Sequence, residues 1–163
     1  MNAKKRYLTM LRMFFIKDRR DKAAYLKRKK IFASFGENCS YHPKKLPSEP
    51  ENVFIGNNVH ISADVRFITH DVINDMLVNN ENYPECTRLP FKKGRIDILD
   101  NCVIGAGASI MFNTKIGPNS IVGAGAVVTK DVPSGEIWAG VPAKKIGMVD
   151  DLVKRRMEEA DNG

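Results

Sequence analysis

The stretch from residue 98 to residue 128, ILDNCVIGAGASIMFNTKIGPNSIVGAGAVV, has a branched aliphatic residue at every sixth position. These residues are Ile98, Ile104, Ile110, Ile116, Val122 and Val128. A period of six fits neither an amphipathic helix nor a simple alternating strand. A short segment repeated at a fixed period cannot bury its apolar residue alone, so successive coils must stack. We therefore predict an all-β solenoid, a parallel β-helix of triangular cross-section with three six-residue segments to a coil.

A smaller or modest side chain follows four positions after each aliphatic residue. These side chains belong to Cys102, Ala108, Thr114, Ser120, Ala126 and Val132. We predict that the large residue points inward and that the small one lets the chain turn the corner. The same pattern occurs earlier in the chain, at Ile55, Ile61 and Phe67, and Phe35 begins a first candidate segment.

The two repeat blocks are out of phase with each other. Phe67 and Ile98 are 31 residues apart, which is five repeats plus one residue. A coil of fixed period cannot absorb the odd residue, so residues 71–95 are predicted to leave the coil as a long extruded loop. A loop of this length in a compact domain is usually functional or disordered. The predicted β-helix domain spans residues 34–149 and includes this loop.

The two ends of the chain differ from the body. Residues 1–33 are predicted to form a basic helical segment, with twelve Lys and Arg against two Asp, whereas the rest of the chain holds 14 against 17 acidic residues. This segment has two interpretations: a surface helix that contacts a membrane or a partner, or a cap packed on the end of the β-helix. Asp150 is a candidate N-cap for a helix over residues 151–160, within a C-terminal segment 150–163 that we expect to cover the open end.

Composition restricts the class of protein. The chain has 163 residues, enough for one domain with a sizeable core. No apolar run approaches the ~20 residues of a transmembrane helix, and no secretory signal is recognisable. The three cysteines lack metal-ligand spacing, and Cys39 and Cys102 stand at small inward positions. We expect a cytoplasmic protein, and the mildly acidic body predicts no nucleic-acid partner.

Two motifs resemble those of a known family. Ile121–Pro133, followed by Ala139–Lys144, resembles the coenzyme A-binding end of the hexapeptide-repeat acyltransferase superfamily. Thr69-His70-Asp71 at the mouth of the loop, with Gly94-Arg95-Ile96 after it, resembles the sugar and surface-polysaccharide O-acetyltransferases. The resemblance covers roughly residues 35–147. It implies a left-handed β-helix, acetyl-CoA as co-substrate, no metal, and a homotrimer with active sites between subunits.

The resemblance also implies the residues that carry the chemistry. His70 matches the general base of the family, and an imidazole suits removal of a hydroxyl proton near neutral pH. Asp71 is a second catalytic candidate, which either orients the imidazole, binds the acceptor or merely turns the chain into the loop. Asn113 and the backbone N–H groups from Gly105 to Gly107 are candidate oxyanion donors.

Binding residues follow from the same motifs. Small residues allow the pantetheine arm to lie along the coil, and lysines attract phosphates. The predicted coenzyme A contacts are Ala106, Gly107, Ala124, Gly125, Thr129, Lys130 and Lys144. The predicted acceptor contacts are Tyr83, Arg88, Asn113 and Trp138. For Trp138 an alternative remains open, in which it flanks the cofactor or simply covers the last coil.

We therefore expect an acetyl-CoA-dependent O-acetyltransferase that acts on a sugar or polysaccharide precursor. An N-acetyltransferase for an amino sugar would need the same base and much the same site. A γ-type carbonic anhydrase would need three zinc-binding histidines, but His42, His60 and His70 stand in different repeat phases. A non-catalytic scaffold that binds partners through residues 1–33 would have no affinity for coenzyme A.

Overall fold

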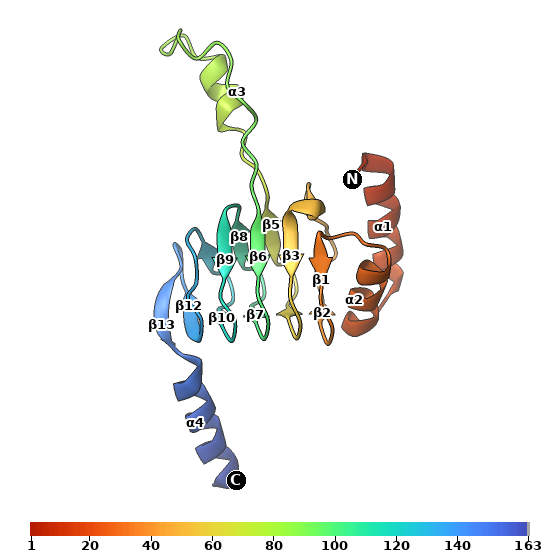
Figure 1. Ribbon diagram of the computed structural model, residues 1–163, viewed down its shortest axis with the longest axis vertical. Helices are drawn as coiled ribbons and strands as arrows, with labels where there is room; N and C mark the ends of the chain where they lie inside the picture. Colours follow the sequence, from red (N-terminus) through yellow and green to blue (C-terminus); the bar gives the residue numbers. More distant parts are fainter. Residues whose placement is uncertain (163) are drawn as a thin grey trace.

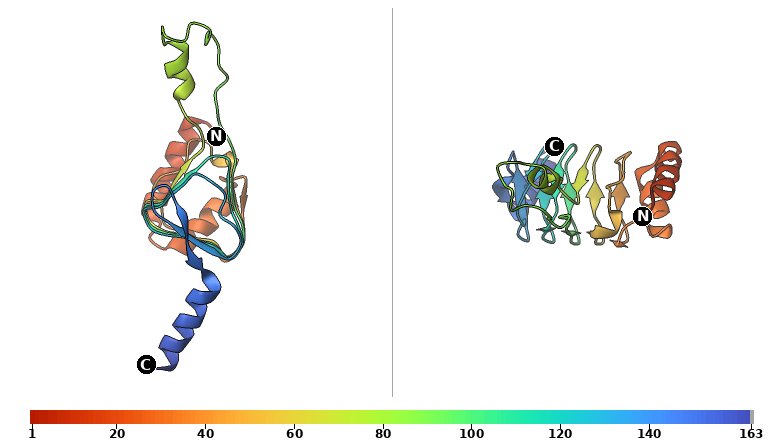
Figure 2. Two further views of the ribbon diagram at one scale, coloured as in Figure 1. Left: turned by 90° about the vertical axis from the view of Figure 1, so that its left-hand side faces the viewer. Right: turned by 90° about the horizontal axis from the view of Figure 1, so that it is seen from above.

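The computed structural model describes residues 1–162 and forms a triangular parallel β-helix (Figures 1 and 2). Sheet A holds β1 (Ser34–Phe35), β3 (Val53–Ile55), β6 (Ile96–Ile98) and β9 (Thr114–Ile116). Sheet B holds β2 (Ser40–Tyr41), β4 (His60–Ile61), β7 (Val103–Ile104), β10 (Ile121–Val122), β12 (Glu136–Ala139) and β13 (Lys144–Met148). Sheet C holds β5 (Arg66–Ile68), β8 (Ser109–Met111) and β11 (Val127–Val128). We name the corners of the triangle AB, BC and CA after the sheets that meet there.

The six aliphatic residues of the repeat form the core. All six side chains are buried. Each coil places its residues against those of the next: Ile98 pairs with Ile116, and Ile104 pairs with Val122. This register confirms the predicted three segments to a coil. Because burial of apolar surface is the main favourable term in folding, stacked aliphatic columns hold the coils together.

The corners are turned one residue earlier than the sequence pattern suggested. Three positions after five of the six aliphatic residues, the backbone takes a positive φ of 56–70°. These residues are Asn101, Gly107, Asn113, Asn119 and Gly125. Glycine and asparagine tolerate this left-handed conformation, which most residues with a Cβ disfavour. The small residue at the fourth position is buried, so its role is to fit beside the core, and the prediction that it turns the corner was wrong.

Corner AB carries a ladder of asparagine side chains. Asn58 Nδ2 donates to Asn101 Oδ1 at 2.9 Å, and Asn101 Nδ2 donates to Asn119 Oδ1 at the same distance. The three residues belong to consecutive coils. The ladder therefore links the coils on the outside of the corner, while the aliphatic columns link them inside.

Two helices close the amino-terminal end of the coil. They are α1 (Ala3–Phe15) and α2 (Arg19–Arg28). Asp18 is the N-cap of α2, and its carboxylate accepts hydrogen bonds from backbone N–H groups in the first turn of that helix. Met13 and Leu26 are buried and join the core of the β-helix. The interpretation of residues 1–33 as a cap is therefore confirmed.

The carboxyl-terminal end differs from the prediction in two ways. Helix α4 (Val149–Asp161) begins after Met148, and Asp150 lies inside its first turn, so Asp150 is not the N-cap. The helix also projects away from the body and buries none of its residues (Figure 1). The reason is that β13 pairs antiparallel with β12 and directs the chain outward. Residue 163, the last of the predicted segment, lies outside the described residues.

The extruded loop leaves the coil at corner CA, between β5 and β6. It carries the short helix α3 (Ile73–Val78), which buries no residue, and it stands well clear of the coil (Figure 1). At its base His70 and Lys93 form an antiparallel bridge, and Asp71 N donates to Lys92 O at 3.2 Å. The loop therefore has a defined neck. Within residues 1–162, no helix is long and apolar enough to cross a bilayer.

The corner geometry makes a prediction about Asn101. Asn101→Ala puts a residue that has a Cβ but no side-chain amide in the left-handed region, and it removes the hydrogen bonds of the ladder. The variant should therefore lower the free energy of unfolding by about 1–2 kcal/mol. Asn101→Gly breaks the same hydrogen bonds but tolerates the backbone conformation. Chemical denaturation should place the glycine variant between the wild type and the alanine variant. Equal stability of the two variants would contradict a role for the positive φ.

Candidate active site

His70 lies at corner CA, directly after β5 and at the neck of the loop. Gly94 N donates to Thr69 O at 3.0 Å, which closes the neck beside it. The ring of Phe91 also lies beside His70, with its centroid 5.0 Å from that of the imidazole. The His70 side chain is 27% exposed, so it is held in place but remains accessible.

A carboxylate orients this histidine. Glu49 Oε2 lies 2.8 Å from His70 Nδ1, and the hydroxyl of Thr69 hydrogen-bonds the same oxygen. When the imidazole is neutral, Nδ1–H donates to the carboxylate and Nε2 keeps its free lone pair. This is the arrangement a general base requires, with one ring nitrogen held and the other open.

Glu49 reaches this position through an irregular segment. After β2, residues 42–52 take the place of a sheet C strand in the first coil, and the 3₁₀ helix η1 (Pro50–Asn52) leads into β3. Glu49 stands immediately before η1, so it arrives at corner CA next to the coil that carries His70. Pro50 at the start of η1 fixes the backbone there.

The charge state of Glu49 suits this role. Burial raises the pKa of the carboxyl group, but the hydrogen bonds from Thr69 and His70 outweigh burial, and the pKa is lowered overall. Glu49 is therefore ionised at neutral pH. An ionised carboxylate both orients a neutral imidazole and stabilises the imidazolium that forms when the base takes a proton.

Sequence reasoning missed Glu49. It lies 21 residues before His70, and no repeat relates the two positions. The one available signal is a carboxylate between Pro47 and Pro50 in a segment that departs from the repeat. That signal gives no partner, because the corner that joins Glu49 to His70 exists only in the folded coil.

Asp71 contacts the backbone of the loop. Its Oδ1 accepts a hydrogen bond from Ile73 N at 3.2 Å, at the start of α3. This contact is the one expected of a residue that turns the chain into the loop. The carboxylate bound to His70 is that of Glu49, and a catalytic role for Asp71 stays a prediction.

The small residues predicted to bind coenzyme A lie at corner BC. Gly107 N donates to Ala63 O and Gly125 N donates to Ala106 O, each at 2.8 Å, so the turns of successive coils stack. Ala106, Ala124 and Gly125 are exposed. A Cβ added to Gly107 or Gly125 would meet no atom within 4 Å, which shows that the strip is open to solvent. An open strip of small residues fits close approach of an extended ligand to the backbone.

The seven predicted cofactor residues do not form one cluster in a single chain. Thr129 and Lys130 follow β11 and therefore lie at corner CA, across sheet C from the alanine and glycine strip. Lys144 begins β13, opposite Ala139. Lys130 and Lys144 are both exposed. The lysines are thus free to meet phosphates, but at different edges of the molecule.

Two of the candidate oxyanion donors remain available, Ala106 N and the side chain of Asn113. Gly105 N already donates to Val122 O at 2.8 Å, and Gly107 N is used in the turn described above, so neither of these two N–H groups is free in this chain. Within the described part of the chain, Ala106 N has no backbone acceptor. Asn113 lies at corner CA, where its side chain packs over Gly94 at the loop neck, next to the residues that flank His70.

The predicted acceptor contacts are dispersed. Tyr83 and Arg88 are exposed in the loop, beyond the neck that holds His70. Trp138 is half-buried in β12 and donates its Nε1–H to Glu136 Oε2 at 2.6 Å. Of the four, only Asn113 shares the corner of His70 in one chain.

The histidines engage separate partners. His60 lies 3.0 Å from Ser40 Oγ through Nδ1 and 3.1 Å from Asn58 Oδ1 through Nε2. In residues 1–162, no group of three or more His, Cys, Asp or Glu side chains is placed to hold a metal ion.

Known proteins share the repeat and the fold. Residues 96–130 match the bacterial transferase hexapeptide family (six repeats). Protein CapG of Staphylococcus aureus is 35% identical over 138 residues, which cover 83% of this chain and 77% of that protein. The galactoside O-acetyltransferase of Escherichia coli strain K12 is 31% identical over 139 residues, which cover 77% and 68% of the two chains. A solved galactoside acetyltransferase in complex with coenzyme A is 26% identical, with a TM-score of 0.60 over 93% of this chain and 84% of that one.

These matches define the family and leave the substrate open. Other matching proteins are N-acetyltransferases by name, and the chain spans only 28% of the length of one of them. The solved relatives imply that the coil is left-handed. Three findings agree: the repeat, the fold, and the sequence identity to relatives that the chain covers over most of their length. The chain therefore belongs to the hexapeptide-repeat acetyltransferase superfamily, and within it the chain is similar to the sugar O-acetyltransferases.

Proposed function

We propose that this protein is an acetyl-CoA-dependent O-acetyltransferase that acetylates a hydroxyl group of a sugar or polysaccharide precursor. The observation that carries the proposal is the hydrogen-bonded pair of Glu49 and His70 at the neck of the loop. The names of the galactoside O-acetyltransferase relatives support an acceptor hydroxyl on a sugar. The coenzyme A bound to the solved relative supports the acyl donor.

The chain's own groups account for each proton movement. His70 Nε2 takes the proton of the acceptor hydroxyl as its oxygen attacks the thioester carbonyl carbon, and Glu49 stabilises the resulting imidazolium. The N–H of Ala106 is the donor proposed for the oxyanion that develops on the carbonyl. When the carbon–sulfur bond breaks, His70 returns the proton to the departing thiolate. No proton is gained or lost in the cycle.

We propose that the strip at corner BC holds the pantetheine arm of the acyl donor and that the lysines meet its phosphates. The strip is open and lined by small residues, so an extended chain can lie against it and hydrogen-bond backbone groups. Lys144 lies near the end of this strip, because Ala143 N donates to Val127 O just beyond it.

We propose that the active enzyme is a homotrimer, because sheet C separates the base from the strip in one chain. A neighbouring copy that sets its corner BC against corner CA would complete the site, and cyclic packing repeats the same contact around the ring. Two projecting elements also expose large apolar side chains. The exposed residues are Val72, Ile73, Met76, Val78, Tyr83 and Phe91 in the loop, and Val153 and Met157 on α4.

We place the enzyme in the cytoplasm, where buried thiols such as Cys39 and Cys102 remain reduced.

An amino-sugar acceptor is the second candidate. The same pair of residues would serve an amine, and some matching proteins are N-acetyltransferases by name. Release of free thiol from acetyl-CoA, measured against a panel of sugars, nucleotide sugars and amines, separates the two. Turnover with hydroxyl acceptors supports the proposal, and turnover with amines alone contradicts it.

Replacing the base tests the mechanism. His70→Ala should lower acetyl transfer by roughly 10²-fold or more, because a general base contributes on this scale. Affinity for coenzyme A, measured by calorimetry, should stay unchanged, since the strip proposed to hold the pantetheine arm does not include His70. His60→Ala removes a histidine outside the site and serves as the control. Near-normal turnover of the His70 variant would remove this residue from the mechanism.

Replacing the orienting carboxylate should act on the rate constant. Glu49→Gln keeps the size of the side chain but removes its charge, so kcat should fall by roughly tenfold or more while the KM for acetyl-CoA stays unchanged. Glu51→Gln, two residues further along, is the matched control. A change in KM alone would show that Glu49 serves binding instead of the base.

The lowered pKa of Glu49 also predicts a pH dependence of stability. A carboxyl group whose pKa is lower in the folded chain stabilises the fold above its unfolded pKa, near 4.5, and this contribution is lost as the pH falls through the folded pKa. The wild type should therefore resist urea better than Glu49→Gln at neutral pH. The difference should persist down to about pH 4.5 and then shrink. A difference that grows on acidification would contradict this assignment.

The strip can be blocked by one bulky residue. Ala124→Trp should raise the KM for acetyl-CoA by roughly tenfold or more, because the indole would occupy the space of the ligand. Ala33→Trp, at an exposed alanine before β1, is the matched control. Steady-state kinetics at saturating acceptor measure both variants. Equal KM values would show that the acyl donor lies elsewhere.

A further inference from the structure

Helix α1 has two apolar faces, and only one of them packs against the β-helix. Thr9 and Met13 mark the inner face and are buried. The outer face carries five large apolar or aromatic side chains that are 46–73% exposed. They are Tyr7, Leu8, Leu11, Phe14 and Phe15. The role of α1 as a cap explains the inner face and leaves the outer one without a function.

The outer face is surrounded by positive charge. Residues 1–17 contain four exposed cations, Lys4, Lys5, Arg12 and Lys17, and no acidic residue. A fifth, Arg6, turns toward the body and donates to Leu46 O at 3.4 Å. Where Asp and Glu are absent, these cations cannot be neutralised within the helix. A ligand that covers the face must therefore tolerate or supply negative charge.

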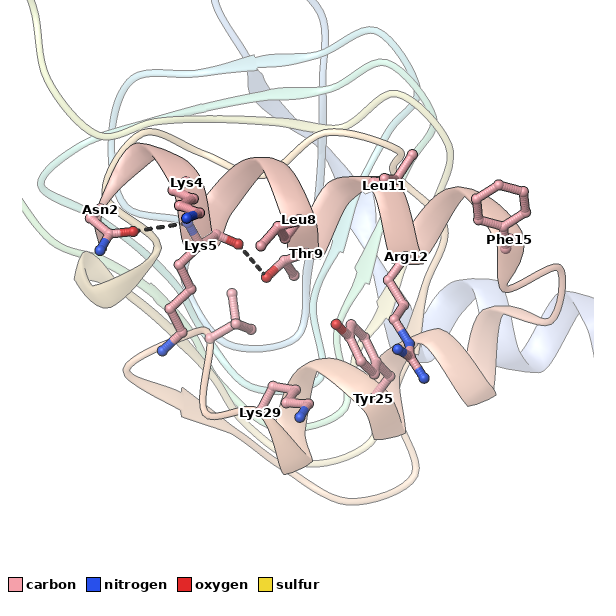
Figure 3. A pocket seen from close by; sticks show the side chains of 11 residues that line it. Asn2, Lys4, Lys5, Leu8, Thr9, Leu11, Arg12, Phe15, Tyr25 and Lys29 are labelled. Atoms are coloured by element: carbon pink, nitrogen blue, oxygen red, sulfur yellow. Dashed lines mark hydrogen bonds between the residues drawn. The ribbon is translucent and has the colours of Figure 1, made fainter.

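A groove between α1 and α2 repeats this combination. Its volume is about 790 Å³, and in Figure 3 Lys5 and Arg12 extend from α1 toward α2, where Tyr25 and Lys29 lie. The groove has apolar walls that include Leu8. Among the described residues that line it there is no carboxylate. The groove thus offers apolar contact together with cations at its rim.

The position of α1 favours a large, flat partner. The helix lies across the end of the coil, at the opposite end from β12 and β13, and the loop and α4 project from other parts of the body (Figures 1 and 2). An apolar, aromatic face flanked by Lys and Arg is the pattern of a helix that lies in the interface of a bilayer with anionic lipids. A soluble acidic protein would satisfy the charges, but it would give no reason for two adjacent exposed phenylalanines.

We propose that α1 docks the protein on the surface of an anionic phospholipid bilayer. Phe14, Phe15 and Leu11 enter the boundary between headgroups and acyl chains, and Lys4 and Arg12 meet lipid phosphates. The sequence allowed two interpretations of residues 1–33, a helix on a membrane surface and a cap on the β-helix. In the structure, α1 can serve both purposes at once. Docking is independent of the transfer reaction, so it can fail while the proposed function holds.

Vesicle flotation of the full chain tests the proposal. We expect the protein to float with vesicles of phosphatidylcholine and phosphatidylglycerol, to bind pure phosphatidylcholine much more weakly, and to be released by salt. Phe14→Ser combined with Phe15→Ser should weaken binding to the anionic vesicles by roughly tenfold or more, given the apolar area removed. The combination of Lys4→Glu and Arg12→Glu should do the same.

Matched variants on α4 serve as controls. Val153→Ser with Met157→Ser removes two exposed apolar side chains, and Lys154→Glu with Arg155→Glu reverses two exposed charges, so neither pair should change flotation. Light scattering of each variant reports its assembly. The proposal is overturned if the wild type does not float with anionic vesicles, if the α1 and α4 variants bind equally, or if the phenylalanine variant loses its oligomeric state, which would make this face a subunit contact.

Discussion

In the regular block of this protein, each coil must return its aliphatic residue to the same place in the core after eighteen residues. Ile98 pairs with Ile116, and any shift by one residue would turn a buried side chain outward. Extra or irregular residues are therefore accommodated at a corner or in place of a strand at the end of the coil. Two departures from the repeat meet at corner CA, the segment 42–52 and the stretch between β5 and β6, which contains the neck and the loop. One brings Glu49 and the other brings His70, so the strictness of the core determines where the reactive pair forms.

The same geometry divides the site. Sheet C separates the base at corner CA from the open strip at corner BC, and no change of side-chain rotamer can bring His70 to Ala124. An acetyl group and a hydroxyl must meet within bonding distance for transfer to occur. A single chain thus carries both halves of an active site without joining them. A neighbouring copy is the proposed means of joining them, and the exposed apolar side chains of the loop and α4 are consistent with it.

The sequence predicts what depends on period and misses what depends on the folded coil. The aliphatic ladder, the long loop and the position of His70 at its neck follow from counting residues. The partner of His70 does not, since Glu49 reaches it only because two irregular segments share a corner. The repeat also predicted the corner residue one position too late. The corner is turned at Asn101, where φ is positive, whereas the small residue that follows it, Cys102, is buried beside the core. The direction of α4 depends on an antiparallel pairing of β13 that no repeat indicates.

The central claim is that each active site uses corner CA of one chain and corner BC of another. Mixing His70→Ala chains with Ala124→Trp chains, followed by unfolding and joint refolding, tests it directly, because each variant supplies the half that the other lacks. With equimolar chains and random assembly, about a quarter of the sites would have both halves intact. At an acetyl-CoA concentration well below the KM of the Ala124→Trp variant, the mixture should therefore regain about a quarter of wild-type acetyl transfer. A mixed oligomer that is no more active than the two variants refolded alone would contradict the claim.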